Sequence, residues 1–251
     1  MRSEVKEEIR QFYKDWEQDS KAQKTRIETL KQIFSDTKFT DKRPPTFFAG
    51  QLDAPIVIIG LNPGYSEKDV ENDWELQQKN DSFEDYWNFS QKFFQRCAKR
   101  EKGMNYYSSF SKFIRGLNDD EYKEHATCPN YLHYLEGKVL NIDLIPYHST
   151  SIDSIDPSDS ETQEVLQIYE EIVRKIINLH DREKVIITGK NNYKYWKSEK
   201  DFNLRKVGTY NKRIDYTKTE FKDWNTIVLK QFFPGVGLTT QERYLLGQAL
   251  R

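Results

Sequence analysis

A short polar segment directly follows an apolar run and is the first place where the chain could do chemistry. The run over residues 55–61 reads Pro-Ile-Val-Ile-Ile-Gly-Leu, and Asn62 comes next in a Pro- and Gly-containing turn. In an open α/β sheet, ligands bind beyond the carboxyl ends of the strands, so this amide is placed to contact one. The two glycines of the turn let the backbone approach a ligand closely, and its proline stiffens the turn. An ordinary turn at the end of a strand is the alternative.

The turn resembles a known motif. Five consecutive residues are similar to the first active-site motif of the uracil-DNA glycosylase superfamily: Gly60, Leu61, Asn62, Pro63 and Gly64. The closest likeness is to the mismatch-specific and single-strand-selective branches, whose motif ends in Asn-Pro-Gly. The resemblance covers the layout of residues 55–250, but it is specific only over this motif and, more loosely, over the second apolar run. It implies base excision, in which a nucleotide is extruded into a pocket, hydrogen-bonded along its Watson–Crick edge and stacked on an aromatic ring.

The resemblance implies a role for each residue of the motif. Asn62 takes the place of the residue that positions or activates the water attacking the sugar C1′. Because an amide cannot be a strong general base, Asn62 is expected to orient water while electrostatics stabilise an oxocarbenium-like sugar and the departing base. Tyr65 is expected to form a wall of the pocket, and the rest of the motif to contact the substrate. No metal and no cofactor is required.

The second apolar run supplies the position that reads the base. In the single-strand-selective branch, an Asn lies three residues before a proline at the end of this strand. Here Asp143 takes that place before Pro146, and Asn141 lies on the same strand face, so both are expected to bind the substrate. An ionised carboxylate only accepts hydrogen bonds, so it would repel the O4 of uracil and suit the exocyclic amino group of a cytosine-type base. We therefore expect a cytosine-like or modified base. A bond from Asp143 to a neighbouring loop backbone is the alternative.

Two other segments are candidates for contacts with the substrate or with DNA. His148, at the mouth of the second strand, can hold a proton near neutral pH and donate to the base O2 or to a phosphate, as an auxiliary catalytic group. A histidine in a surface loop is the alternative. Lys190 and Lys194 begin a stretch, residues 190–223, with ten basic and five acidic residues. This stretch suits contact with a DNA backbone, although a solvated surface explains it equally well.

After the fourth apolar run, the resemblance implies a second motif and a loop that wedges into the duplex. Phe233 stands where the family has His or Asn to donate to the base O2, and this departure argues against uracil-type catalysis. Val236 and Leu238 are expected to act as wedge residues. The whole loop is expected to contact DNA: Pro234, Gly235, Val236, Gly237 and Leu238. A buried loop packed on the last helix is the alternative.

The elements that position these residues follow from apolar patterning. Near-continuous, β-branched runs predict strands buried on both faces of a parallel sheet, over residues 55–61, 139–146, 184–189 and 225–233. Helical spacing predicts helices between and after them, over residues 83–100, 105–117, 162–179 and 241–250. This alternation predicts a three-layer α/β/α fold around a four-stranded, mostly parallel sheet. We expect one domain over residues 1–251, with residues 1–45 as a helical N-terminal extension.

The composition of the chain excludes several classes of protein. The 251 residues include 39 Lys and Arg against 40 Asp and Glu, for a net charge of −1, which argues against a protein that coats nucleic acid by bulk attraction. Two cysteines, Cys97 and Cys128, are too few for a disulfide scaffold, a zinc finger or a four-cysteine iron–sulfur site. No run reaches the roughly 18–20 apolar residues of a membrane span, and the charged start lacks the apolar stretch of a secretory signal. We expect a cytoplasmic monomer.

These observations favour a DNA glycosylase-like enzyme acting on single-stranded DNA or on mismatched or modified duplexes. Two other functions stay open. One is a non-catalytic module of the same fold that binds a nucleotide, a nucleic-acid end or a protein, which Phe233 and the near-zero net charge favour. The other is a hydrolase of free nucleosides or nucleotides, which needs the same pocket without a track for DNA.

Overall fold

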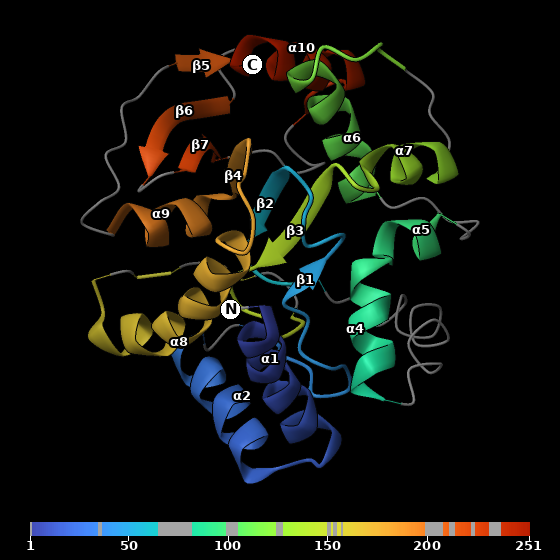
Figure 1. The fold of residues 1–251 in the computed structure, drawn as a ribbon. Helices are drawn as coiled ribbons and strands as arrows, with labels where there is room; N and C mark the ends of the chain where they lie inside the picture. The colour runs from blue at the N-terminus through green and yellow to red at the C-terminus, as the bar shows by residue number, and fades with distance from the viewer. Residues whose placement is uncertain are drawn as a thin grey trace.

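One sheet forms the centre of the molecule (Figure 1). The structure is a computed structural model that describes residues 2–34, 37–64, 82–98, 105–123, 128–149, 152, 155–156, 158–198, 208–210, 214–221, 224–230 and 237–251. The strands found there are β1 (Phe48–Ala49), β2 (Ile56–Gly60), β3 (Val139–Asp143), β4 (Lys184–Thr188), β5 (Gly208–Tyr210), β6 (Ile214–Phe221) and β7 (Trp224–Leu229). Within these residues the sheet has seven strands in the order β1-β3-β2-β4-β7-β6-β5.

The four central strands are parallel and coincide with the four apolar runs. β3, β2, β4 and β7 pair in that order, whereas β1 at one edge and β6 and β5 at the other are antiparallel. The α/β class is therefore confirmed, but the expectation of four strands is wrong for the sheet as a whole. The search for apolar runs missed β6 because five of its eight residues, in the sequence Ile-Asp-Tyr-Thr-Lys-Thr-Glu-Phe, are polar. Antiparallel strands are often polar on one face, unlike the buried strands of a parallel sheet.

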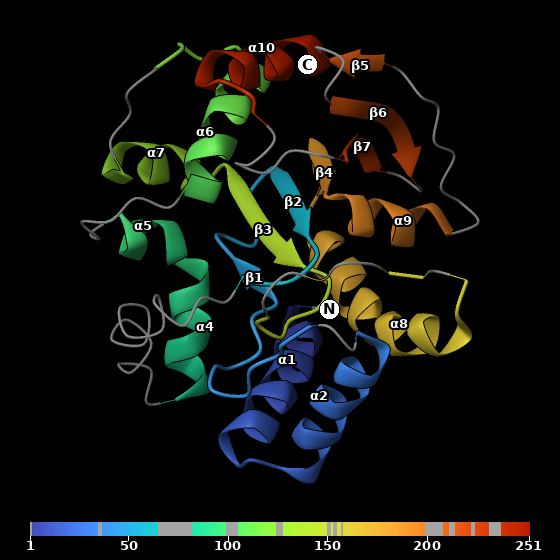
Figure 2. The ribbon, with the colours of Figure 1, turned by 180° about the vertical axis from the view of Figure 1, so that it is seen from behind.

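Helices cover both faces of this sheet (Figures 1 and 2). They are α1 (Arg2–Glu17), α2 (Lys21–Ile33), α4 (Phe83–Gln91), α5 (Phe93–Cys97), α6 (Asn105–Leu117), α7 (Cys128–Leu135), α8 (Ser160–Ile177), α9 (Lys190–Ser198) and α10 (Thr240–Leu250). Side chains of α1, α2, α4, α8 and α9 join one buried apolar cluster, and those of α5, α6, α7 and α10 join a second. In the part of the chain described, no helix is both long enough and apolar enough to cross a bilayer.

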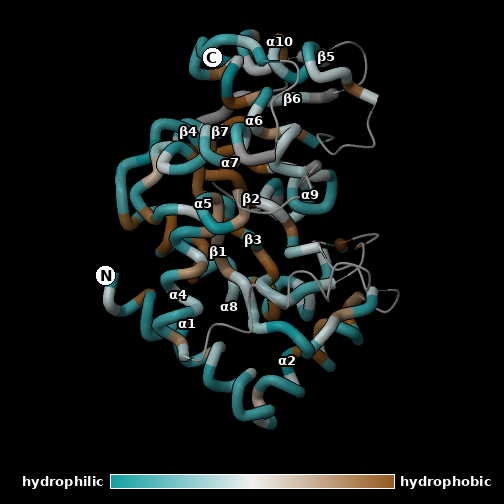
Figure 3. Tube along the Cα trace, turned by 90° about the vertical axis from the view of Figure 1, so that its right-hand side faces the viewer, coloured by the Kyte–Doolittle hydropathy of each residue, from teal (hydrophilic) through white to brown (hydrophobic). Residues whose placement is uncertain are grey.

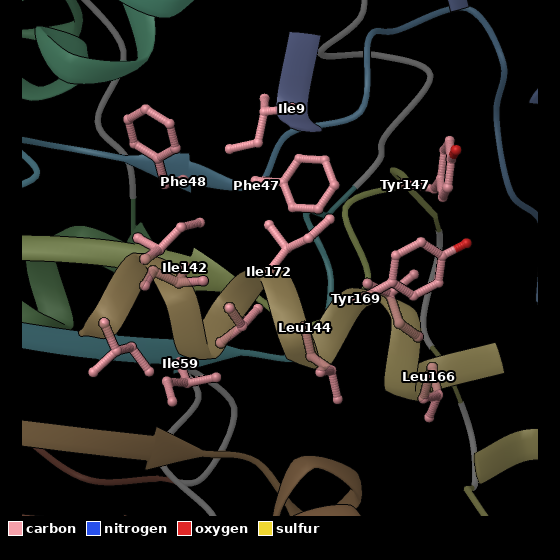
Figure 4. Close-up of a cluster of buried hydrophobic side chains, with 14 of the residues drawn as sticks. Ile9, Phe47, Phe48, Ile59, Ile142, Leu144, Tyr147, Leu166, Tyr169 and Ile172 are labelled. Carbon is pink, nitrogen blue, oxygen red and sulfur yellow. The ribbon is translucent and has the colours of Figure 1, made fainter. Parts of the chain in front are cut away.

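Alternation along the strands divides the core between these two clusters. Val57 and Ile59 face the first cluster, while Ile56 and Ile58 face the second, because successive side chains of a strand point to opposite faces. The apolar residues accordingly concentrate along the central strands (Figure 3). Ile9 of α1 lies in the first cluster, close to Phe47 (Figure 4). The N-terminal helices therefore pack on the same core as the sheet.

Two glycines allow α6 and α10 to cross closely above the second cluster. A Cβ atom at Gly116 would lie 1.9 Å from the Tyr244 carbonyl oxygen, and one at Gly247 would lie 2.1 Å from the Phe113 carbonyl oxygen. Both contacts are with backbone atoms, which cannot move without shifting a helix. This crossing fixes the position of α6, whose first turn borders the site described below.

We expect Gly247→Ala to lower the free energy of unfolding by about 1–3 kcal/mol, because overpacking outweighs the gain in helix propensity of up to about 1 kcal/mol. Urea denaturation followed by circular dichroism measures this change. Gln241→Ala, at an exposed position of the same helix, is the control and should leave the midpoint unchanged. An unchanged midpoint for Gly247→Ala would show that the two helices can separate at no cost.

Candidate functional site

The carboxyl ends of β2, β3 and β4 lie next to one another where these parallel strands end. We call this the edge of the sheet at which the site lies, as distinct from its outermost strands. β2 lies between β3 and β4 in the sheet. After β2 the chain therefore forms the neighbour on one side, β3, and then returns past β2 to form the neighbour on the other side, β4. In doubly wound sheets, ligands bind where the strand order reverses in this way. The last residues of these strands are Gly60, Asp143 and Thr188. This edge is therefore the candidate site.

The chain segments that follow β2 and β3 continue side by side beyond the sheet. The backbone N–H of Leu144 donates to Gly60 O at 3.1 Å, and that of Ile145 donates to Leu61 O at 2.8 Å. Gly60 is directly opposite Asp143 in the register, and Asn62 is two residues further on. The backbones at Asn62 and Asp143 are therefore within roughly 10 Å of each other. The structure brings the predicted amide and carboxyl to the same edge.

Asn62 is half-buried, and its amide has a defined orientation. Its Nδ2 donates to Ser149 Oγ at 2.8 Å and to the Pro63 carbonyl oxygen at 3.0 Å. Because a carbonyl only accepts, the group facing Pro63 must be the amide nitrogen. Oδ1 has no hydrogen-bond partner among the described residues. The amide thus retains an acceptor for a further ligand, such as water.

Asp143 is a buried carboxyl group, with 7% of its surface exposed. A Cβ atom at Gly60 would lie 2.3 Å from Asp143 Oδ1, so only glycine leaves room for the carboxyl there. Burial raises the pKa of Asp143 to about 7, and the hydrogen bond from Asn141 Nδ2, at 3.3 Å to Oδ2, opposes this rise only in part. Near neutral pH a large fraction of the group is protonated. The argument from an ionised carboxylate therefore describes only one of the two forms of this group.

Asn141 supports Asp143 and is not itself available to a base. Its Nδ2 donates to Asp143, and its Oδ1 accepts from the Tyr106 hydroxyl at 3.2 Å. Burial raises the pKa of Tyr106 well above its ordinary value, and the nearby Asp143 adds to the rise, so the phenol stays protonated and donates. The expectation that Asn141 binds substrate is corrected, because both ends of its buried amide already have partners. Tyr106, at the start of α6, is a site residue that the sequence did not indicate.

His148 also has a different role from the one expected. It is 6% exposed, and burial, with a smaller contribution from Arg43, lowers its pKa to about 4. Its Nδ1 lies 3.4 Å from the Gly64 carbonyl oxygen, so Nδ1 carries the proton, and Nε2 accepts from the Thr46 hydroxyl at 3.0 Å. The ring is neutral at physiological pH, and both nitrogens are used. It cannot be the protonated donor expected from a histidine at the strand mouth.

The remaining residues of the motif divide into supporting and exposed positions. Leu61 packs against the first apolar cluster, and this contact anchors the turn to the core. The Pro63 carbonyl oxygen accepts from the Ser149 backbone as well as from Asn62. Gly64 is exposed, and a Cβ atom there would meet no atom of the described residues within 4 Å. Gly64 is therefore the motif residue with room for a ligand beside its backbone.

The residues expected to contact DNA lie in different environments. Lys190 is exposed at the first residue of α9, directly after β4 and at the same edge as Asn62. Lys194 is half-buried one turn later and lies close enough to Asp156 to lower the pKa of that carboxyl, after the larger effect of hydrogen bonds from Ser158. Leu238 is 6% exposed and belongs to the second apolar cluster. The expectation that it wedges into DNA is corrected, because its side chain is already used in the core.

Some of the predicted residues cannot be placed. Gly237 is exposed, with a φ of 70° that favours glycine. The other expected site residues lie outside the described residues: Tyr65, Phe233, Pro234, Gly235 and Val236.

Ser149 was also missed by sequence reasoning, although a signal was present. It lies in the Pro-Tyr-His-Ser sequence that begins three residues after the end of β3, and polar residues after a buried strand are candidates for a site at the sheet edge. Tyr106 carried no such signal, since its ring reaches the site from a helix on the second face.

Comparison with known proteins adds no family assignment. No protein-family model matches the chain, and no curated protein matches it in sequence. Among the described residues, no three His, Cys, Asp or Glu side chains converge as metal ligands would. The functional interpretation therefore depends on the geometry of this edge and on the resemblance of the short motif.

The two glycines of the motif provide a test of the close approach between Gly60 and the Asp143 carboxyl. We expect Gly60→Ala to displace the Asp143 carboxyl and to shift its pKa, because the new Cβ atom would overlap Oδ1; overpacking of this kind costs about 1–3 kcal/mol of stability. Gly64→Ala is the matched control and should change neither quantity. Carbon-13 NMR titration of the Asp143 carboxyl, together with urea denaturation, measures both. Equal behaviour of the two variants would contradict the placement of Asp143 over Gly60.

Proposed function

We propose that this protein is a DNA glycosylase that hydrolyses the N-glycosidic bond of a pyrimidine extruded from DNA. The observation that carries the proposal is the pair of groups at the ends of β2 and β3. Asn62 has a fixed amide whose Oδ1 has no hydrogen-bond partner among the described residues, and the nearby Asp143 is a buried carboxyl with a strongly raised pKa. A buried, perturbed carboxyl at the ligand-binding edge of a sheet is typical of a functional site.

Asn62 would orient the water. Its Oδ1 can accept a hydrogen bond from a water molecule, while Ser149 and Pro63 hold the nitrogen. An amide does not take up a proton at neutral pH, so the reaction depends on departure of the base and on electrostatic stabilisation of the sugar cation, with the water adding at C1′. The bond between C1′ and the base nitrogen breaks, and water supplies the hydroxyl group at C1′ and the proton that the base finally carries.

Asp143 would read the Watson–Crick edge of the base. A protonated carboxyl offers one donor and one acceptor, as an amide does, and so can pair with the N3–H and O4 of a uracil-type base. An ionised carboxylate offers acceptors only, which suits an exocyclic amino group at C4. With a pKa of about 7, both forms are present near neutrality. The proposed substrates therefore include both classes of pyrimidine, with pH deciding between them.

The fold and the motif support the same proposal. The four central parallel strands and the helices on both faces are of the kind that the uracil-DNA glycosylase resemblance implies, although the sheet of the described residues has seven strands. The motif begins at the last residue of β2, next to the reversal of strand order. Lys190 is exposed at this edge, where it can contact a phosphate. A hydrolase of free nucleosides would not need such a contact, so a steep dependence of binding on salt would favour DNA as the substrate.

The proposal is tested with single-stranded and duplex oligonucleotides that carry uracil, cytosine or modified cytosines, followed by alkali cleavage at abasic sites. We expect release of at least one of these bases, and we expect Asn62→Ala to slow it by roughly 100-fold or more, as is common when a group that positions the reacting water or proton is removed. Asn88→Ala, at an exposed position of α4, is the control. Binding without cleavage, equally strong in the wild type and in Asn62→Ala, would instead support a non-catalytic binding module.

The protonation of Asp143 predicts a change of substrate preference with pH. Because its pKa is raised, the carboxyl is protonated below about pH 7 and ionised above it. Release of a base with a carbonyl at C4 should therefore fall by about tenfold per pH unit above 7, relative to release of a base with an amino group at C4. The nearest phenols, Tyr106 and Tyr107, have raised pKa values and stay neutral in this range. Single-turnover rates on the two substrates between pH 6 and 9 measure the ratio.

Asp143→Asn is the control for this pH dependence. It keeps one donor and one acceptor but does not titrate, so the ratio of the two rates should no longer depend on pH. A ratio that is constant with pH in the wild type would contradict the role of Asp143 in reading the base.

A further inference from the structure

The three residues Tyr147, His148 and Ser149 follow β3, and each is tied to a different part of the chain. All three are buried, although they lie in a loop. The Tyr147 hydroxyl donates to Gln23 Oε1 in α2 at 3.0 Å, and its ring packs edge-on against Tyr169 of α8 (Figure 4). His148 connects the motif to Thr46, as described above. A loop held at so many points has little freedom to move.

Ser149 is the point at which this loop meets the motif. Its backbone forms bridges with Gly64 on one side and with Phe39 on the other, and its N–H donates to the Pro63 carbonyl oxygen at 3.2 Å. Its Oγ accepts from Asn62 Nδ2 at 2.8 Å. The amide nitrogen therefore lies between two acceptors, Ser149 Oγ and the Pro63 carbonyl oxygen. A reversed amide would place Oδ1 against both oxygens, and the resulting repulsion with the Pro63 carbonyl disfavours it.

The N-terminal segment supports the other side of this loop. The Thr40 N–H donates to the His148 carbonyl oxygen at 3.0 Å, and the Thr46 N–H donates to the Pro146 carbonyl oxygen at 2.7 Å. The Thr46 hydroxyl also donates to His148 Nε2. The segment that follows the two N-terminal helices thus holds one side of the loop, and the motif holds the other side.

We propose that Ser149 is the positioning residue of this site. It holds the Asn62 amide nitrogen, so that Oδ1, which has no partner within the described part of the chain, can orient the attacking water. The buried loop 147–149, anchored by the N-terminal segment, holds Ser149. This inference rests on the proposed glycosylase function for the role of Oδ1. The orientation of the amide, however, is a property of the protein alone. It also gives the N-terminal extension, which no motif covers, a role in the site.

Ser149→Ala tests the proposal in two independent ways. The first is hydrogen exchange of the Asn62 side-chain amide, followed by nitrogen-15 NMR and assigned by its absence from Asn62→Ala. Loss of the bond to Oγ should speed this exchange. The second is the rate of base release, which should fall by about 3- to 10-fold, as expected for one neutral hydrogen bond. This loss should appear in kcat and leave KM unchanged.

Three comparisons separate positioning from a general effect on stability. Ser90→Ala also removes a buried serine hydroxyl, one that donates to the Tyr86 carbonyl oxygen in α4, and it should change neither measurement. Ser149→Thr retains the oxygen and should restore slow exchange. In an Asn62→Ala background, Ser149→Ala should have no further effect on the rate, because the two residues act as one unit.

The outcomes distinguish the two proposals. Unchanged exchange in Ser149→Ala, or the same rate loss in Ser90→Ala, overturns the positioning role while leaving the glycosylase function intact. Faster exchange in a protein that releases no base from any oligonucleotide supports Ser149 as a residue that holds the Asn62 amide and overturns the glycosylase function. Faster exchange together with a slower rate supports both.

Discussion

The parallel pairing of β2 with β3 is the constraint on which the site depends. It places Gly60 opposite Asp143, and the same pairing continues to Leu61 and Ile145 beyond the ends of the strands. Buried backbone groups must form hydrogen bonds, so the two chain segments cannot separate without losing bonds that water does not replace. The amide of one segment and the carboxyl of the other are therefore held at the same edge.

The carboxyl at this edge is held in its position at an energetic cost. Removing a charged group from water is unfavourable, and a buried carboxyl responds by becoming protonated more easily. Asn141 and Tyr106 form a hydrogen-bonded chain that ends at Asp143, and such chains define one arrangement of polar groups within an apolar surrounding. The close crossing of α6 and α10 keeps Tyr106 in reach. Packing on the second face therefore sets the chemistry of a residue on β3.

The first face contributes in a different way. α1 and α2 pack in the same apolar cluster as the sheet, and Gln23 bonds to Tyr147 in the loop after β3. The helical extension is thus joined to the candidate site by direct contacts, although more than a hundred residues separate the two in sequence. The contact is made through the loop and not through the motif, which is why composition and motif matching did not connect the extension with the site.

The sequence alone determined the four parallel strands, most of the flanking helices and the position of Asn62 after a buried strand, because apolar periodicity and turn residues are local signals. It also indicated Asp143 through its place on the second strand. It did not indicate α7 or α9. Only the tertiary structure decided that the pKa of Asp143 is raised to about 7, that His148 is neutral and that both ends of the Asn141 amide are bonded, because desolvation depends on neighbours far apart in the chain. Leu238 shows the same limit, because a leucine after a glycine looks the same in sequence whether it is buried in the second apolar cluster or exposed. Protonation and burial are properties of the packed core, and no local pattern encodes them.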